Sequence, residues 1–308
     1  MLVSVLVPIY NVAPFMEKCA RSLFSQSYYD IEFVFVDDAS PDESVKILCE
    51  TLKDYPQRSA SVKIISHPVN KGLAAARNTA VDNASGSYIL HVDSDDWLEP
   101  DAVESLVATA VGENADIVYS DFIEIRKEST DILSNPDIHE SVEYTKSLLR
   151  RKSLTHVIGK LIKKSLITDN GIRAVEGLNQ GEDYLVTPKI AYYSAKVAKL
   201  NKPIYNYNRL NVGSYTANVS DTGIDMVIMV QQLLVDFFSG IPDADKYRST
   251  IAESCIFNKL TCFYCGPFSS YEKISRLYAD VDWRKMNLSK KQKAVLSLSE
   301  LGLSLIHI

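Results

Sequence analysis

The first hundred residues alternate apolar runs with segments that are apolar on one side only. Four apolar runs follow one another, at residues 2–8, 31–36, 62–66 and 88–92. The first run is rich in Val and almost continuously apolar, as expected of a strand covered on both faces. Helical patterns lie between the runs, such as Phe15, Cys19 and Leu23 on one face and the Ala-rich segment 72–84. This alternation predicts an α/β fold, with an open, mostly parallel sheet flanked by helices, which binds ligands where its strands end.

The loop after the second apolar run carries a helix-start signal. Ser40 can cap a helix, Pro41 suits the first helical position, and Glu43 completes a capping box with Ser40. We therefore expect the second helix to begin at Pro41.

Beyond Asp101 the alternation is looser. The pattern predicts strands at 116–125 and 199–207, a mainly helical stretch at 142–168, a helix at 184–194, and helices after 220. No low-complexity linker divides the chain. We expect the nucleotide-sugar-binding half of one domain at 1–100, its acceptor-binding and catalytic half at 101–215, and a helical extension at 216–308.

The composition is that of a soluble globular protein. Of the 308 residues, 46% are apolar and 23% are charged, which excludes a mostly disordered chain. No apolar run reaches the roughly 18 residues of a membrane-spanning helix. The N-terminus lacks a basic segment and a small-residue cleavage site, so we expect no signal peptide. Five scattered cysteines, with one CxxC at Cys262 and Cys265, indicate buried thiols in a reducing cytoplasm rather than a zinc site.

The net charge of −6 is concentrated in the first third of the chain. Residues 1–100 hold 8 Lys and Arg against 14 Asp and Glu, whereas the remaining residues hold 25 of each. An acidic surface disfavours nucleic acid as a partner. An anionic ligand bound to this third would need a metal cation.

Three carboxylates crowd into four residues at the end of the fourth apolar run. Asp93, Asp95 and Asp96 repel one another unless a positive group lies among them. Oxygen ligands at this density suit Mg²⁺ or Mn²⁺, which keep water and substrate phosphates as further ligands. The alternative is an acidic turn ahead of the next helix. The strand-end position and the acidity of the region favour the metal site.

Other residues at strand ends and helix starts suit a nucleotide. Asp37 and Asp38 can accept hydrogen bonds from a base or ribose, although the helix dipole also favours acids there. Tyr10 could stack on a base or simply pack. Lys71 or Arg77 could meet a phosphate, the alternative for Arg77 being an ion pair. The first strand–helix turn has no glycine, and neither GxGxxG nor a P-loop occurs.

Five segments together carry a family resemblance. In chain order they read VSVLVPIYN, VDDASPDES, NKGLAAARN, HVDSDDWL and GEDY. This set resembles the inverting family 2 glycosyltransferases, which have a GT-A fold, over about residues 1–215. The resemblance implies a GT-A-like fold and transfer of a sugar from a nucleotide-diphosphate donor, with UDP expected, aided by Mn²⁺ or Mg²⁺.

The resemblance also implies a role for each matching position. Those that hold the nucleoside or contact the nucleotide are matched by Pro8, Tyr10, Asp37, Asp38, Lys71, Gly72 and Arg77. Asp93 and Asp95 match the DxD pair, with Asp95 as the expected direct metal ligand. Asp96 is expected at the donor sugar, and Asp183 matches the catalytic base. Two looser matches are an NKL element at Lys160, in which Gly159 replaces the usual Asn, and a donor-side loop with Arg209 and Ser214.

The implied chemistry suits these residue types. Transfer passes through an oxocarbenium-like transition state and leaves negative charge on the diphosphate, which a divalent cation stabilises. A base on the opposite face, Asp183, takes the proton of the acceptor hydroxyl and the anomeric centre inverts. The alternative for Glu182 and Asp183 is a pair of acids at a helix start.

Two rival functions remain open at this point. A nucleotidyltransferase also pairs acids with Mg²⁺, but it usually has a Gly-rich, basic loop after the first strand, which this chain lacks. A binding module would keep the nucleotide pocket without turnover. The acidic set of Asp93, Asp95 and Asp183 is complete, which speaks against such decay.

The C-terminal third contains a basic stretch without acids. Its members are Arg284, Lys285, Lys290, Lys291 and Lys293. A membrane-surface segment would suit a lipid-linked acceptor, but a solvated helix face is the alternative we favour. We expect a cytoplasmic enzyme of surface polysaccharide synthesis, with peripheral contact at the inner face of the membrane left open. Its acceptor is expected to be a glycan or a lipid-linked glycan.

Overall fold

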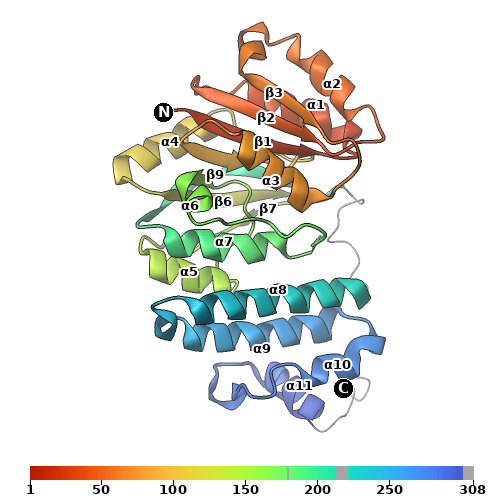
Figure 1. Cartoon of the computed structure of the whole chain (residues 1–308), viewed down its shortest axis with the longest axis vertical. Coiled ribbons are helices and arrows are strands. Elements are labelled where there is room, and N and C mark those ends of the chain that lie inside the picture. Colours follow the sequence, from red (N-terminus) through yellow and green to blue (C-terminus); the bar gives the residue numbers. More distant parts are fainter. Residues whose placement is uncertain (179, 212–220, 301–308) are drawn as a thin grey trace. The chain divides into compact units, whose positions relative to one another are not determined.

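The chain divides into two compact units, Met1–Gly213 and Ser214–Ile308. The computed structural model describes residues 1–178, 180–211 and 221–300 (Figure 1). The first unit is a mixed α/β fold and the second is helical. The expected domain limit between 215 and 216 lies outside the described residues.

The described strands of the first unit form one mixed sheet. They are β1 (Val3–Ile9), β2 (Ile31–Asp37), β3 (Val62–Ser66), β4 (Tyr88–His91), β5 (Trp97–Leu98), β6 (Ile117–Ile125), β7 (Thr130–Leu133), β8 (Leu161–Lys163) and β9 (Val197–Asn208). Their order is β3-β2-β1-β4-β8-β6-β9-β5, with β7 paired to β6. The strands β3, β2, β1 and β4 are parallel, whereas β8 runs antiparallel to both of its neighbours.

Helices cover both faces of this sheet. They are α1 (Ala13–Phe24), α2 (Ser44–Leu52), α3 (Leu73–Asn83), α4 (Ala102–Glu113), α5 (Ser141–Leu149), α6 (Ser165–Thr168) and α7 (Glu182–Tyr193), with the 3-10 helix η1 (Pro56–Ser61) before β3. One apolar core contains residues of α1, α2 and α4, and the other contains residues of α3, α5, α6 and α7. Val5 and Val7 of β1 belong to the first core and Leu6 belongs to the second. The continuous apolar run at 2–8 is therefore a strand covered on both faces, as the sequence predicted.

The parallel register brings the predicted functional residues to one edge of the sheet. Ile9 at the end of β1 pairs with Asp37 at the end of β2, and Leu6 pairs with His91 at the end of β4. The acids that follow β2 and β4 therefore lie at the same edge, beside the first turn of α3.

The polar residues of the loop after β2 contact the starts of two helices, α1 and α2. The helix α2 begins at Ser44, so the predicted start at Pro41 is wrong. Asp42 instead accepts a hydrogen bond at 2.8 Å from the backbone nitrogen of Ala13, the first residue of α1. Ser40 accepts one at 2.8 Å from the backbone nitrogen of Asn11. Asp42 also accepts a hydrogen bond at 3.1 Å from the backbone nitrogen of Ser44, the first residue of α2. The polar residues of this loop thus contact the starts of both α1 and α2, and local sequence does not reveal the contact with α1.

The stretch 142–168 is less helical than the pattern predicted. Between α5 and α6 the chain forms an irregular loop and the short strand β8. Gly159 in this loop has φ of +65°, a left-handed conformation that Gly and Asn tolerate best. A Cβ there would lie 2.7 Å from the Phe122 ring. The positive φ suits both Gly and Asn, whereas the short distance to the Phe122 ring favours Gly, which has no Cβ.

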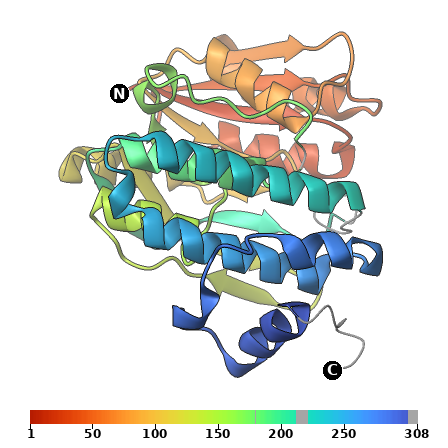
Figure 2. The same ribbon diagram turned by 60° about the horizontal axis from the view of Figure 1, so that its bottom comes forward.

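The second unit consists of helices in its described part. They are α8 (Asp221–Gly240), α9 (Arg248–Cys265), α10 (Tyr271–Arg276) and α11 (Lys290–Glu300), with the 3-10 helices η2 (Ala244–Lys246), η3 (Phe268–Ser270) and η4 (Trp283–Lys285). Figure 2 shows α8 and α9 side by side, and the two helices are in contact. By length and composition alone α8 could cross a membrane, although Asp225 and Asp236 lie within it.

The cysteines depart in part from the expectation of buried thiols. Cys19, Cys255 and Cys262 are buried, whereas Cys49 and Cys265 are exposed. All five lie in the described part of the chain, and no disulfide joins them.

Candidate active site

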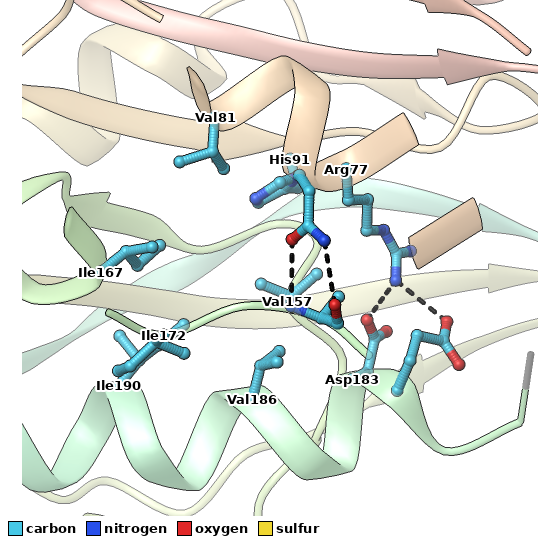
Figure 3. Close-up of a pocket in the computed structure, with 12 residues that line it drawn as sticks. Arg77, Val81, His91, Val157, Ile167, Ile172, Asp183, Val186 and Ile190 are labelled. Atoms are coloured by element: carbon cyan, nitrogen blue, oxygen red, sulfur yellow. Dashed lines mark hydrogen bonds and ion pairs between the residues drawn. The ribbon is translucent and has the colours of Figure 1, made fainter. Parts of the chain in front are cut away.

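Arg77 of α3 joins the acid turn after β4 to the start of α7. Its side chain is 6% exposed. Its Nη2 donates to Asp93 Oδ1 at 3.0 Å, and its Nη1 donates to Glu182 Oε1 at 3.0 Å. The same Nη1 also donates to Asp183 Oδ1 (Figure 3). Burial alone would lower the pKa of Arg77, but the three negative charges outweigh it and raise the pKa above its ordinary value. The ion pair that we gave as the alternative role of Arg77 is therefore present, and it lies at the centre of the candidate site.

The start of α7 presents two acids with different environments. Gly181 precedes the helix with φ of +80°, which places Glu182 and Asp183 in the first turn, where the helix dipole favours negative charge. Burial and the charge of Asp183 raise the pKa of Glu182 to about 7. The second carboxylate oxygen of Asp183 accepts no hydrogen bond from any described residue, and its side chain is 16% exposed. Asp183 thus has one oxygen held by Arg77 and one available.

Asp38 organises the loop that leads into α3. Its oxygens accept hydrogen bonds from the backbone nitrogens of Lys71 at 2.9 Å and Gly72 at 2.7 Å. His67 Nδ1 lies 2.6 Å from Asp38 Oδ1, and its Nε2 lies 2.9 Å from Thr79 Oγ1. Because Asp38 is buried, this network fixes both its carboxylate and the helix start beside it.

The remaining nucleotide-site predictions lie around the same edge. Tyr10 follows β1 and is 42% exposed, so its ring has a face available for stacking. Pro8 is buried within β1 opposite Val36. Asp37 accepts a hydrogen bond at 2.8 Å from the backbone nitrogen of Ser40, and Lys71 has an exposed side chain.

Asp96 faces the protein interior. Its side chain is buried, and burial together with the charges of its neighbours raises its pKa well above the usual range. Tyr205 Oη donates to Asp96 Oδ2 at 2.7 Å, and the backbone nitrogen of Asn208 donates to Oδ1 at 2.7 Å. Both oxygens, which we expected at the donor sugar, are thus engaged by β9. We assign Asp96 the role of fixing the acid turn.

Asp93 and Asp95 each keep one carboxylate oxygen that accepts no hydrogen bond from any other described residue. Arg77 occupies Asp93 Oδ1, and Asn211 Nδ2 donates to Asp95 Oδ2 at 2.8 Å. Burial and the charge of Asp93 raise the pKa of Asp95. No group of three or more His, Cys, Asp or Glu in the described residues could hold a metal by itself. Two open oxygens nevertheless fit Mg²⁺ or Mn²⁺ that also binds water and substrate phosphates.

A small apolar cavity lies on the inner side of Arg77. Among its lining residues are Val81, Val157, Ile167, Ile172, Val186 and Ile190 (Figure 3). His91 also lines it, and burial together with the nearby charge of Arg77 lowers the pKa of His91 to about 3. His91 is therefore neutral near physiological pH. The low polarity on this side strengthens the attraction between Arg77 and its carboxylates.

In the described part of the chain, neither Lys160 nor Arg209 forms a hydrogen bond or ion pair with the acids of the candidate site. Lys160 is buried and donates to the carbonyl oxygens of Leu154 at 2.9 Å and His156 at 2.6 Å, and burial lowers its pKa to about 7. It supports the loop before β8. Arg209 lies 3.5 Å from Glu124, and Ser214 lies outside the described residues. The sequence analysis assigned no role to His67, Tyr205, Asn208 or Asn211, although the last three lie beside Arg209 in the loosely matching donor-side loop.

Comparisons with known proteins place this geometry in context. The model of the family "Glycosyl transferase family 2" matches residues 4–165. The chain is 34% identical over 225 residues to glycosyltransferase GlyA of Streptococcus pneumoniae serotype 4, covering 69% of this chain and 31% of GlyA. It is 43% identical over 103 residues to chondroitin synthase of Escherichia coli, covering 33% of this chain and 14% of the synthase. The chain thus spans less than a third of either relative.

The fold also matches solved structures. The crystal structure of S. aureus TarS 1-349 in complex with UDP-GlcNAc aligns with a TM-score of 0.75 and 18% identity, covering 98% of this chain and 88% of that chain. The class of the protein is therefore a glycosyltransferase with a GT-A-like α/β fold and a helical C-terminal region, as expected. Within that class, the chain belongs to glycosyl transferase family 2.

Proposed function

We propose that this protein is a metal-dependent, inverting transferase that moves a sugar from a UDP-sugar to a hydroxyl of a glycan or lipid-linked glycan in surface polysaccharide synthesis. The observation that carries the proposal is the Arg77 cluster. One buried guanidinium joins Asp93 of the DxD turn to Asp183, so the donor end and the base belong to one site.

The donor is assigned to residues 1–100 and the acceptor to residues 101–215, with the helical extension at 216–308. The exposed ring of Tyr10 and the fixed carboxylate of Asp38 lie at the strand ends where nucleotide sites occur. We assign Asp37, Lys71, Gly72 and Pro8 to the same nucleotide site. The complex of TarS with UDP-GlcNAc supports a UDP-linked donor for this fold.

The cation site is assigned to Asp95 and Asp93, each through its open carboxylate oxygen. A divalent cation there supplies neutralisation of the charge that develops on the leaving diphosphate. Asp93 and Asp95 are the residues that would hold this cation, while Arg77 holds Asp93 in place.

Asp183 is assigned the role of general base. Its available oxygen takes the proton of the acceptor hydroxyl, while Arg77 holds the other oxygen and limits rotation of the carboxylate. The hydroxyl oxygen then attacks the anomeric carbon opposite the diphosphate, which departs, so the configuration inverts. No group on the protein needs to form a covalent intermediate.

A donor panel with Mn²⁺ tests this function directly. We expect release of the nucleoside diphosphate from one UDP-sugar, and faster release when a glycan acceptor is added. The measurement is enzyme-coupled detection of UDP, with GDP- and dTDP-sugars as controls. Binding of a UDP-sugar without release, with or without acceptor, would favour a binding module. Release of pyrophosphate from a nucleoside triphosphate would favour a nucleotidyltransferase.

Membrane contact is a separate proposal for the C-terminal unit of a cytoplasmic enzyme. Arg284 pairs with Glu300 and Lys285 with Asp282, which leaves three lysines of α11 without an ion pair among the described residues. Each such lysine contributes about 1 kcal/mol near an anionic surface. We expect weak co-sedimentation with phosphatidylserine vesicles at low salt, lost at physiological salt, where the screening length is about 8 Å. No binding at low salt removes the membrane proposal.

A further inference from the structure

The side chain of Asn211 reaches the acid turn from the far end of β9. Its Nδ2 donates to Asp95 Oδ2 at 2.8 Å. The side chain of Asn208, at the end of the same strand, donates to the backbone carbonyl of Asp95 at 3.0 Å. Asp95 is therefore held at its backbone and at one carboxylate oxygen by residues that lie more than a hundred positions later in the chain.

Because of this contact, the two carboxylate oxygens of Asp95 have different surroundings. Oδ2 is engaged by the amide of Asn211, and Oδ1 accepts no hydrogen bond from any other described residue. A carboxylate that is already oriented by a hydrogen bond loses less side-chain freedom when it binds a cation. Removing such an outer partner of a metal ligand typically weakens metal binding by about 10- to 100-fold.

We infer that Asn211 is a positioning residue of the cation site, which orients Asp95 so that its open oxygen can bind the ion. The inference rests on the metal dependence proposed above. By linkage, an ion bound to Asp95 stabilises the contact with Asn211 by the same factor. Occupancy of the donor site is thereby coupled to the order of residues 208–211.

The inference is tested by Mn²⁺ binding to the full chain with saturating UDP, measured from the electron paramagnetic resonance signal of free Mn²⁺. We expect Asn211→Ala to bind Mn²⁺ about 10- to 100-fold more weakly than the wild type. Asn211→Gln, which keeps an amide donor, recovers part of the loss. The affinity for UDP without metal stays unchanged. Leu210→Ala is the matched control, because the neighbouring Leu210 is 45% exposed and its removal should change neither affinity.

Hydrogen exchange gives a second readout. We expect Mn²⁺ with UDP, compared with UDP alone, to slow amide exchange in a peptide covering residues 205–211 of the wild type but not of Asn211→Ala. Equal Mn²⁺ affinities of wild type and Asn211→Ala overturn this inference alone. Tighter Mn²⁺ binding by Asn211→Ala also overturns it and shows that the amide competes with the ion. No Mn²⁺ binding by wild type with UDP overturns the proposed metal dependence, and this inference with it.

Discussion

Replacing Asp183 by Asn is expected to reduce turnover by about 100- to 10,000-fold, the contribution of a single general base. The affinity for UDP should stay nearly intact. The amide oxygen of Asn can still accept the hydrogen bond from Arg77, so the ion cluster keeps its geometry. The amide cannot, however, take up the proton of the acceptor hydroxyl. The rate constant is measured by UDP release in the presence of acceptor, and UDP affinity by calorimetry.

Glu182→Gln is the matched control for this experiment. Glu182 is the preceding residue and bonds to the same Arg77 nitrogen, but its raised pKa of about 7 means that it is partly protonated near neutral pH. A Gln side chain resembles that protonated form, so we expect a small effect on turnover. Wild-type turnover by Asp183→Asn would contradict the assignment of the base. A large loss in Glu182→Gln with little loss in Asp183→Asn would transfer the role to Glu182.

The part of the fold that the sequence predicted best is the part whose pattern is local. The apolar run at 2–8 and the Ala-rich segment 72–84 have spacings that belong to one element each, and both elements are present as β1 and α3. The antiparallel strand β8 has three residues, too few to show a period, and it lies in the stretch 142–168 that the pattern predicted to be mainly helical. The signal at 40–43 correctly indicated a helix start, but the helix begins three residues later than predicted, and the contact of Asp42 with α1 follows from the fold alone.

In the candidate site, too, the residues with a local sequence pattern were the ones that could be predicted. Acids crowded at a strand end, such as Asp93 and Asp95, are conspicuous in sequence because their mutual repulsion needs an explanation. Tyr205 and Asn208 carry no such signal, since each is an ordinary polar residue until β9 lies beside the acid turn. Arg77 was recognised, but Glu182 and Asp183 lie more than a hundred residues after it, so its central position follows from the fold alone.

Replacing Arg77 by Met is expected to lower the free energy of unfolding by about 3–5 kcal/mol, because the variant leaves buried carboxylates without their cation. This is a large part of the total stability of a typical domain, which is about 5–15 kcal/mol. The measurement is urea unfolding followed by circular dichroism. Arg173→Met is the matched control. Among the described residues, Arg173 forms an ion pair only with Asp82. Both side chains are about half exposed, so the loss of Arg173 should cost about 0–1 kcal/mol.

The pH dependence of this loss separates charge from packing. Burial and the charge of Asp183 already raise the pKa of Glu182 while Arg77 opposes them, and removal of Arg77 takes that opposition away. Groups whose pKa is raised on folding bind more protons in the folded state, so folding is favoured as the pH falls. The deficit of Arg77→Met relative to the wild type should therefore shrink as the pH is lowered from neutral. Arg77→Lys keeps the charge without the planar fork, so its deficit should be smaller and less dependent on pH. A deficit of Arg77→Met that does not change with pH would mean that Arg77 stabilises the site by packing rather than by charge.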